Sequence, residues 1–299
     1  MESNDILRRY DSDIRVSIPM TEEEQIARTS APVTVGSLVE DLCALGLRAG
    51  DLVLVHASLS SLGWVNGGPV AAIQALLRIA GEGGTIVMPA QSANLTNPDN
   101  WRAPSVPEAW RNTIRDTMPV YDPHITPTRD MGCIAELFRC WPGAVRSDHP
   151  STSFAAVGPL AAQVVSGHKL DDPLGASSPL GTLYRLGAKV LLMGVDFDKC
   201  TALHLAEQMV WADRPKLQEG APLLIDGKRQ WVSFDVPRLM DSEHFVPVGV
   251  SALQAGMAAI GPLGEGRGVL VDMRRLVEHA VSIWSSRPDP ASAKDGERG

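Results

Sequence analysis

The sequence predicts an α/β fold: a three-layer α/β/α domain with a mixed, mostly parallel central sheet. Apolar strand patterns alternate with helical patterns between residues 34 and 210, an order that builds a parallel sheet covered by helices. A later pair of short strand patterns, joined by an Asp-Gly turn, predicts an antiparallel hairpin added to that sheet. The length of 299 residues and the apolar fraction of 44% suit one large globular domain.

The predicted domain opens with a helix over residues 35–45. Thr34 is a typical N-cap residue and Gly46 a typical helix end. Residues 51–56, Asp-Leu-Val-Leu-Val-His, then form a buried strand pattern. The next predicted elements are a helix over 70–79, a strand over 85–88, and helices over 131–140, 160–165 and 181–186. The long irregular segment 91–127 interrupts this series, and loops of this length are usually functional or act as lids.

The stretch from Val190 to Glu207 combines an apolar strand, a polar turn and the start of a helix. Loops at the carboxyl ends of sheet strands collect ligands, and helix N-termini offer free N–H groups. His204 and Glu207 are three residues apart, so they share one face of a helix. An imidazole beside a carboxylate can act as a general base; the alternative is a surface His–Glu pair.

The loop over residues 56–69 is rich in Ser and Gly and joins a strand to a helix. Such a loop can bring backbone N–H groups and hydroxyls close to phosphates. It matches neither the GxGxxG pattern nor a Walker A loop. A plain strand–helix connection is therefore the alternative interpretation.

The last third of the chain has a different pattern. Residues 222–225 and 230–234 flank the turn Asp226-Gly227, which predicts the hairpin. We predict one domain over residues 31–284, an N-terminal arm over 1–30 and a disordered tail over 285–299, because the tail is rich in Pro, Ser and charge.

Composition excludes several classes of function. The four cysteines show no CxxC spacing, which argues against a zinc site and a disulfide framework, and we expect no metal. The N-terminus lacks a signal-peptide pattern and no run of 18 apolar residues occurs, so we expect a cytoplasmic protein without a membrane partner. The net charge of −8 disfavours nucleic acid and suits a cationic small molecule.

Taken together, six motifs in this order resemble the aminoglycoside N3-acetyltransferase family, over roughly residues 34–280. The motifs are His56-Ala-Ser-Leu-Ser-Ser-Leu-Gly63, Trp64-Val-Asn-Gly-Gly68, Thr126-Pro-Thr-Arg129, Arg146-Ser-Asp-His-Pro150, Ser153-Phe-Ala-Ala156 and Thr201-Ala-Leu-His-Leu-Ala-Glu207. No single motif is decisive, but the ordered set is highly specific.

The resemblance implies transfer of an acetyl group from acetyl-coenzyme A to the 3-amino group of a 2-deoxystreptamine aminoglycoside, which confers antibiotic resistance. The family's catalytic histidine falls on His204, and its Ser-rich loop lies against the phosphopantetheine of coenzyme A. We expect a monomer or homodimer that needs no metal. The candidate coenzyme-binding residues are His56, Ser58, Leu59, Ser60, Ser61, Gly63, Trp64 and Val65.

The proposed chemistry explains the choice of residues. Acyl transfer needs a neutral amine, so a base must remove a proton, and histidine titrates near the working pH. If Thr201 is the N-cap, His204 lies in the first helical turn, where the helix dipole favours neutral imidazole. Glu207 either orients that ring or holds a substrate ammonium. The Thr201 hydroxyl and the N–H groups of the Ser-rich loop are candidate donors to the thioester oxygen.

An aminoglycoside is a polycation, so we expect carboxylates and aromatic rings around it. The candidates are Asp122, Asp171, Asp172, Asp198 and Glu207, with Tyr121 as a wall. For each acid the alternative is a solvated loop charge or a helix cap. The chain departs from the family pattern at Ala176, where many members have an acidic residue, and shortly after Glu207, where many have an arginine and this chain has Gln-Met-Val-Trp. Two alternative functions therefore stay open: the same coenzyme A-dependent acetyl transfer to a different amine, and a coenzyme-binding module without catalysis.

Overall fold

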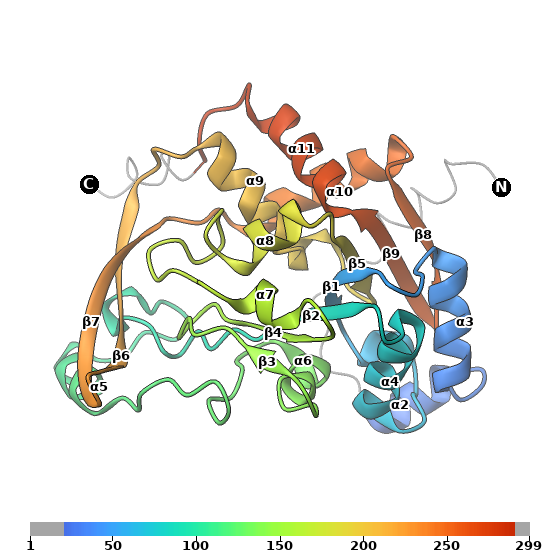
Figure 1. Cartoon of the computed structure of the whole chain (residues 1–299), viewed down its shortest axis with the longest axis horizontal. Coiled ribbons are helices and arrows are strands. Elements are labelled where there is room, and N and C mark those ends of the chain that lie inside the picture. Colours follow the sequence, from blue (N-terminus) through green and yellow to red (C-terminus); the bar gives the residue numbers. More distant parts are fainter. Residues whose placement is uncertain (1–20, 291–299) are drawn as a thin grey trace.

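The structure is a computed structural model that describes residues 21–290 of the chain (Figure 1). At its centre lies a seven-stranded sheet with the strand order β3-β4-β2-β1-β5-β9-β8. The strands are β1 (Leu52–Ala57), β2 (Thr85–Pro89), β3 (Val145–Arg146), β4 (Phe154–Val157), β5 (Lys189–Met193), β8 (Ala258–Leu263) and β9 (Gly266–Asp272). β1 and β5 are neighbours, so the loops that follow them begin side by side.

Parallel pairing is confined to the centre of the sheet. β1 runs parallel to β2 and β5, whereas the pairs β2–β4, β3–β4, β5–β9 and β8–β9 are antiparallel. The predicted α/β class and mixed sheet are confirmed, but the parallel part is smaller than expected. The connections explain the difference, because β8 and β9 are joined by a tight turn at Gly264 and Glu265, which allows only antiparallel neighbours.

Helices cover both faces of the sheet (Figure 1), and a hydrophobic core lies on each face, which confirms the predicted three layers. Val53 and Val55 of β1 point into one core, and Leu52 and Leu54 point into the other, as expected for a strand buried on both faces. We call them the α4 core and the α9 core. The α4 core packs α3 (Val35–Leu45), α4 (Gly68–Ala80) and α6 (Gly132–Phe138); the α9 core packs α7 (Ala161–Val165), α8 (Pro179–Arg185), α9 (Ala202–Val210), α10 (Phe245–Gln254) and α11 (Met273–Trp284).

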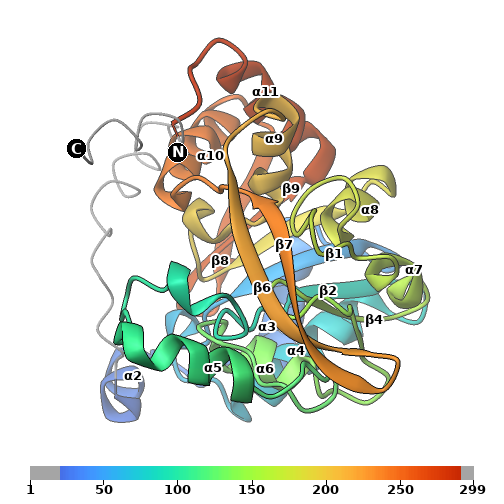
Figure 2. The same cartoon turned by 90° about the vertical axis from the view of Figure 1, so that its left-hand side faces the viewer.

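The predicted hairpin is present but forms a separate two-stranded sheet, β6 (Lys216–Ile225) with β7 (Lys228–Pro237). Asp226 and Gly227 both have positive φ, 50° and 73°, as a type I′ turn requires. The hairpin lies across the long segment 91–127 rather than at an edge of the central sheet (Figure 2). Glu219 of β6 accepts a hydrogen bond from the backbone N–H of Asn97 at 2.8 Å, which joins the two.

The two ends of the described chain are packed against the domain. Helix α2 (Glu22–Arg28) begins at Thr21 with a capping box; the rest of the predicted arm, residues 1–20, lies outside the described residues. Residues 285–290 belong to the predicted tail and are described by the structure; among them, Asp289 pairs with the buried guanidinium of Arg214. Residues 291–299 of that predicted tail lie outside the described residues.

Candidate active site

Helix α9 carries the predicted base. It follows β5 after a turn that contains the 3-10 helix η4 (Phe197–Lys199). Thr201 occupies the N-cap position, so His204 is the third residue of the helix, as expected. The Thr201 side chain does not cap the helix; its Oγ1 lies 3.4 Å from Nε2 of His56, near the end of β1. The hydroxyl is therefore directed across to the neighbouring strand.

His204 and Glu207 form a hydrogen-bonded pair. Nδ1 of His204 lies 2.7 Å from Oε2 of Glu207, and the edge of the Phe245 ring packs on the imidazole with ring centres 4.8 Å apart. The His204 side chain is 12% exposed, whereas that of Glu207 is fully buried. Among residues 21–290 no partner contacts Nε2 of His204. The pair is thus not the surface pair of the alternative interpretation, and one ring nitrogen is held while the other is open.

Glu207 has no free carboxylate oxygen. Oε2 is occupied by His204, while Oε1 accepts hydrogen bonds from Nη1 of Arg214 and from the backbone N–H of Met240. An oxygen that already serves two donors inside the protein is poorly placed to receive a substrate ammonium. The geometry therefore favours a role in orienting the ring.

Arg214 and Met240 are partners of Glu207 that the sequence analysis missed. Residues 208–211 hold no arginine, but Arg214 contacts Glu207 from beyond the end of α9. The only sequence signal was a single arginine seven positions after the glutamate. Met240 acts through its backbone N–H, which leaves no trace in the residue type.

The Ser-rich loop lies at the same edge of the sheet. Its hydroxyls form a cluster, with Ser58 Oγ 2.9 Å from Ser61 Oγ and 3.3 Å from Ser60 Oγ. A Cβ atom at Gly194 would lie 2.8 Å from Cβ of Ser61, and Gly194 has a φ of +70°. Glycine at this position therefore allows the end of β5 to approach the loop closely. The Ser-rich loop therefore lies against the end of β5, the strand that leads into α9.

The later part of the predicted coenzyme loop is engaged elsewhere. The N–H of Trp64 donates to Thr29 Oγ1 at 2.7 Å, and the Trp64 indole donates to Glu22 at 3.1 Å. Val65 is buried and forms a bridge to Val33. The structure therefore packs this part of the loop, including the buried Gly63, against the N-terminal segment rather than beside His204. Leu59, which precedes the 3-10 helix η1 (Ser60–Leu62), is half-buried against the α4 core.

The predicted acceptor residues have local structural contacts. Tyr121 is buried and its hydroxyl donates to the Ser147 carbonyl at 2.7 Å, so it does not form an open wall. Burial raises the pKa of that phenol. Two of the carboxylates accept backbone hydrogen bonds: Asp122 from the N–H of His124 at 2.8 Å, and Asp172 from the N–H of Ser177 at 2.6 Å. The Asp198 carboxylate lies 2.7 Å from Nζ of Lys199. Asp171 is exposed.

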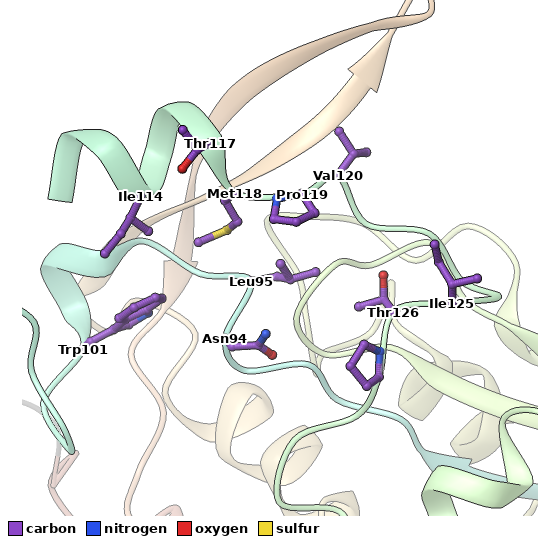
Figure 3. Close-up of a pocket in the computed structure, with 11 residues that line it drawn as sticks. Asn94, Leu95, Trp101, Ile114, Thr117, Met118, Pro119, Val120, Ile125 and Thr126 are labelled. Atoms are coloured by element: carbon purple, nitrogen blue, oxygen red, sulfur yellow. The ribbon is translucent and has the colours of Figure 1, made fainter. Parts of the chain in front are cut away.

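An apolar pocket of about 480 Å³ lies within the segment 91–127 (Figure 3). Leu95, Trp101, Ile114 and Met118 form much of its lining, and His204 is not part of it. The indole N–H of Trp101 donates to Thr96 at 2.8 Å, which fixes that ring. The pocket is thus built by the segment that the sequence predicts to be functional, but it is separate from the His204–Glu207 pair.

Within residues 21–290 no group of three or more His, Cys, Asp or Glu side chains is placed to hold a metal ion. No helix in the same range is long and apolar enough to cross a membrane. The four cysteines are free, and only Cys200 is buried.

Three imidazoles, those of His56, His149 and the half-buried His168, predict that the fold is sensitive to acid. Burial, with a smaller contribution from the charge of His204, lowers the pKa of His56 to about 3. Burial also lowers the pKa of His149 to about 3 and that of His168 to about 4; the two rings lie 4.6 Å apart. Below pH 6.5 the unfolded chain binds protons at these residues that the folded chain does not, so acid favours unfolding. Their stabilising effect is complete above pH 6.5 and is lost as the pH falls to about 4 for His168 and to about 3 for His56 and His149.

We expect the free energy of unfolding to fall by about 1.4 kcal/mol per pH unit for each of these histidines. Urea unfolding between pH 7.5 and 5 measures the slope. His149→Gln should reduce the slope by one histidine's share, whereas His244→Gln, at an exposed position, should leave it unchanged. Equal slopes in both variants would show that His149 is not neutral in the folded protein.

Comparison with known proteins places these features in one family. Residues 54–285 match the sequence profile of the family described as aminoglycoside 3-N-acetyltransferase. The prophage-derived aminoglycoside N(3')-acetyltransferase-like protein YokD of Bacillus subtilis is 46% identical over 270 residues, which cover 90% of this chain and 98% of that protein. Aminoglycoside N(3)-acetyltransferase VIII of Streptomyces fradiae is 40% identical, with 90% and 97% covered.

Solved structures with the same fold include ligand complexes. AAC-IIIb in a binary complex with CoASH superposes with a TM-score of 0.75 at 32% identity, covering 87% of this chain and 100% of that one. Sisomicin-bound AAC-VIa superposes with a TM-score of 0.76 at 30% identity, covering 86% of this chain and 99% of that one. Identities of this size over nearly whole chains relate the sequences as well as the folds.

Proposed function

Because this chain belongs to the aminoglycoside 3-N-acetyltransferase family and is an acyltransferase, we propose that it acetylates the 3-amino group of 2-deoxystreptamine aminoglycosides with acetyl-coenzyme A. The observation that carries this proposal is the His204–Glu207 pair, with Nδ1 held at 2.7 Å and Nε2 open, at the same edge of the sheet as the serine cluster. The CoASH complex of one relative and the sisomicin complex of another support both substrates.

His204 is the proposed general base. Its Nε2 accepts a proton from the acceptor amine as the amine nitrogen attacks the thioester carbonyl carbon. The C–S bond then breaks, and the proton passes from His204 to the departing thiolate, giving the acetamide and free coenzyme A. Glu207 holds Nδ1–H, so the ring presents an unprotonated Nε2 to the amine.

The thioester oxygen needs a donor when it becomes negative. We assign this role to Thr201, assisted by N–H groups of the Ser58–Ser61 loop. Nε2 of His56 lies 3.4 Å from Thr201 Oγ1; if that nitrogen carries the proton, the hydroxyl hydrogen is free for the substrate oxygen. The low pKa of His56, about 3, keeps its ring neutral beside the base.

Direct transfer is favoured over an acetyl-enzyme at Cys200. Burial raises the pKa of the Cys200 thiol to about 12, so this group stays protonated at neutral pH. A protonated, fully buried thiol is a poor nucleophile. Acetyl transfer through Cys200 would therefore lack the thiolate that it requires.

The acceptor's ammonium groups need carboxylates, and Asp122, Asp171, Asp172 and Asp198 are our proposed partners. Asp171 is exposed and the other three are half-buried. Glu207 is excluded from this set because His204, Arg214 and Met240 occupy both of its oxygens.

Thiol release from acetyl-coenzyme A tests the proposed function. The purified protein is incubated with a panel of 2-deoxystreptamine aminoglycosides, and NMR of the product locates the new acetamide. We expect release with at least one of them and acetylation at the 3-amino group, and none with an aminoglycoside that lacks this amine. Release with other amines alone would establish a different acceptor, and no release with any amine would overturn catalysis.

A further inference from the structure

A second buried carboxylate lies behind the His204–Glu207 pair. Arg214, 1% exposed, donates from Nη1 to Glu207 and from Nη2 to Asp289 Oδ1 at 2.7 Å; its Nε lies 3.3 Å from Asp289 Oδ2. Asp289 is 9% exposed. The guanidinium thus directs one edge, Nε and Nη2, to Asp289, and only Nη1 donates to Glu207.

The segment after α11 is built onto the end of α9. The Trp284 ring stacks on Trp211, with ring centres 5.7 Å apart, and the Trp211 indole N–H donates to the Arg287 carbonyl at 3.3 Å. Arg214 itself lies over the Trp211 ring, 5.5 Å from its centre. These contacts place Asp289 beside Arg214 although 75 residues separate them in sequence.

The two carboxylates, Glu207 and Asp289, share the guanidinium of Arg214, and this sharing affects His204. Arg214 alone would compete with His204 for Glu207, because a guanidinium prefers two parallel hydrogen bonds to one carboxylate. Asp289 already satisfies that preference. Oε2 of Glu207 is therefore left for the imidazole.

We propose that Asp289 is a positioning residue for the reaction, acting through Arg214 to keep Glu207 on His204. This inference rests on the proposed function of His204 as the base. Without the Asp289 carboxylate, Nε and Nη2 of Arg214 turn towards Glu207 and draw Oε2 from Nδ1. His204 then loses its fixed orientation, while the serine cluster is unaffected.

Asp289→Asn tests this inference in the full chain. We expect kcat to fall roughly tenfold, part of the 10²–10⁴ that a general base supplies, with the KM values for both substrates unchanged. Asp289→Glu should restore most of kcat because it keeps the carboxylate. Asp213→Asn removes the same charge from an exposed position beside Arg214 and should behave as wild type.

Two further measurements keep the outcome decisive. Arg214→Lys keeps the charge but cannot bridge both carboxylates, so kcat should fall in this variant even if Asp289→Asn does not fold. Proton NMR of the His204 Nδ1–H should show its low-field signal shifted or lost in Asp289→Asn and retained in Asp213→Asn. Because this signal needs no acceptor, it decides the inference even if wild type proves inactive, which would overturn only the proposed function. Wild-type kcat and an unchanged signal in both Asp289→Asn and Arg214→Lys would overturn the inference.

Discussion

Replacing His204 with alanine is expected to lower kcat by about 10²–10⁴-fold, the usual contribution of a positioned acid–base group. The loss follows from the absence of a proton acceptor at the amine, because Nε2 of His204 is the one ring position left open by Glu207. Acetyl-coenzyme A should bind with nearly its wild-type affinity, since the serine cluster belongs to a different loop. Thiol-release kinetics and calorimetric titration with coenzyme A measure the two effects separately.

The control for this experiment is His124→Ala, which removes an exposed imidazole and should leave both measurements unchanged. Full activity in His204→Ala would remove His204 from the mechanism. Loss of coenzyme binding together with activity would instead give His204 a place in the coenzyme site.

Glu207→Gln has the second large effect, on both stability and rate. Glu207 is fully buried between His204 and Arg214, and breaking a buried ion pair from one side typically costs about 3–5 kcal/mol. We expect the lower end, about 3 kcal/mol, because Asp289 still neutralises Arg214. The amide also cannot receive hydrogen bonds at both ends, so kcat should fall as His204 loses its orientation.

Urea unfolding measures the stability change, and thiol release measures kcat in the folded fraction. Glu278→Gln removes the same charge from an exposed position and should change neither. A Glu207→Gln protein as stable as wild type would mean that the carboxylate is not required by its buried partners.

Local patterns in the sequence predict the centre of the site well. The apolar run at 190–193 becomes β5, and the helix that follows begins at Ala202. His204 and Glu207 meet because a spacing of three residues on a helix fixes their distance whatever surrounds them. The Asp226-Gly227 turn is equally local, since its positive φ angles suit these residue types.

Features that depend on distant contacts are not predictable in this way. Asp289 lies in a stretch whose composition indicates disorder, and its pairing with Arg214, 75 residues away in sequence, is a contact that no local pattern reveals. Asp122 and Asp172 look like solvated charges or ligands in the sequence, but each accepts a backbone N–H that only the folded loop supplies. The antiparallel outer strands likewise follow from chain connections, not from the apolar pattern of each strand.

The two halves of the candidate site are anchored in different hydrophobic cores, one on each face of the sheet. Leu62 of the serine-rich loop is anchored in the α4 core, whereas Leu203 and Ala206 of the catalytic helix are anchored in the α9 core. A core substitution therefore reaches one half of the site first. The close approach of Gly194 to Ser61 and that of Thr201 to His56 join the two halves. A substitution in the α9 core is thus expected to alter how the proposed base is held without disturbing the proposed coenzyme loop, provided that this glycine is kept.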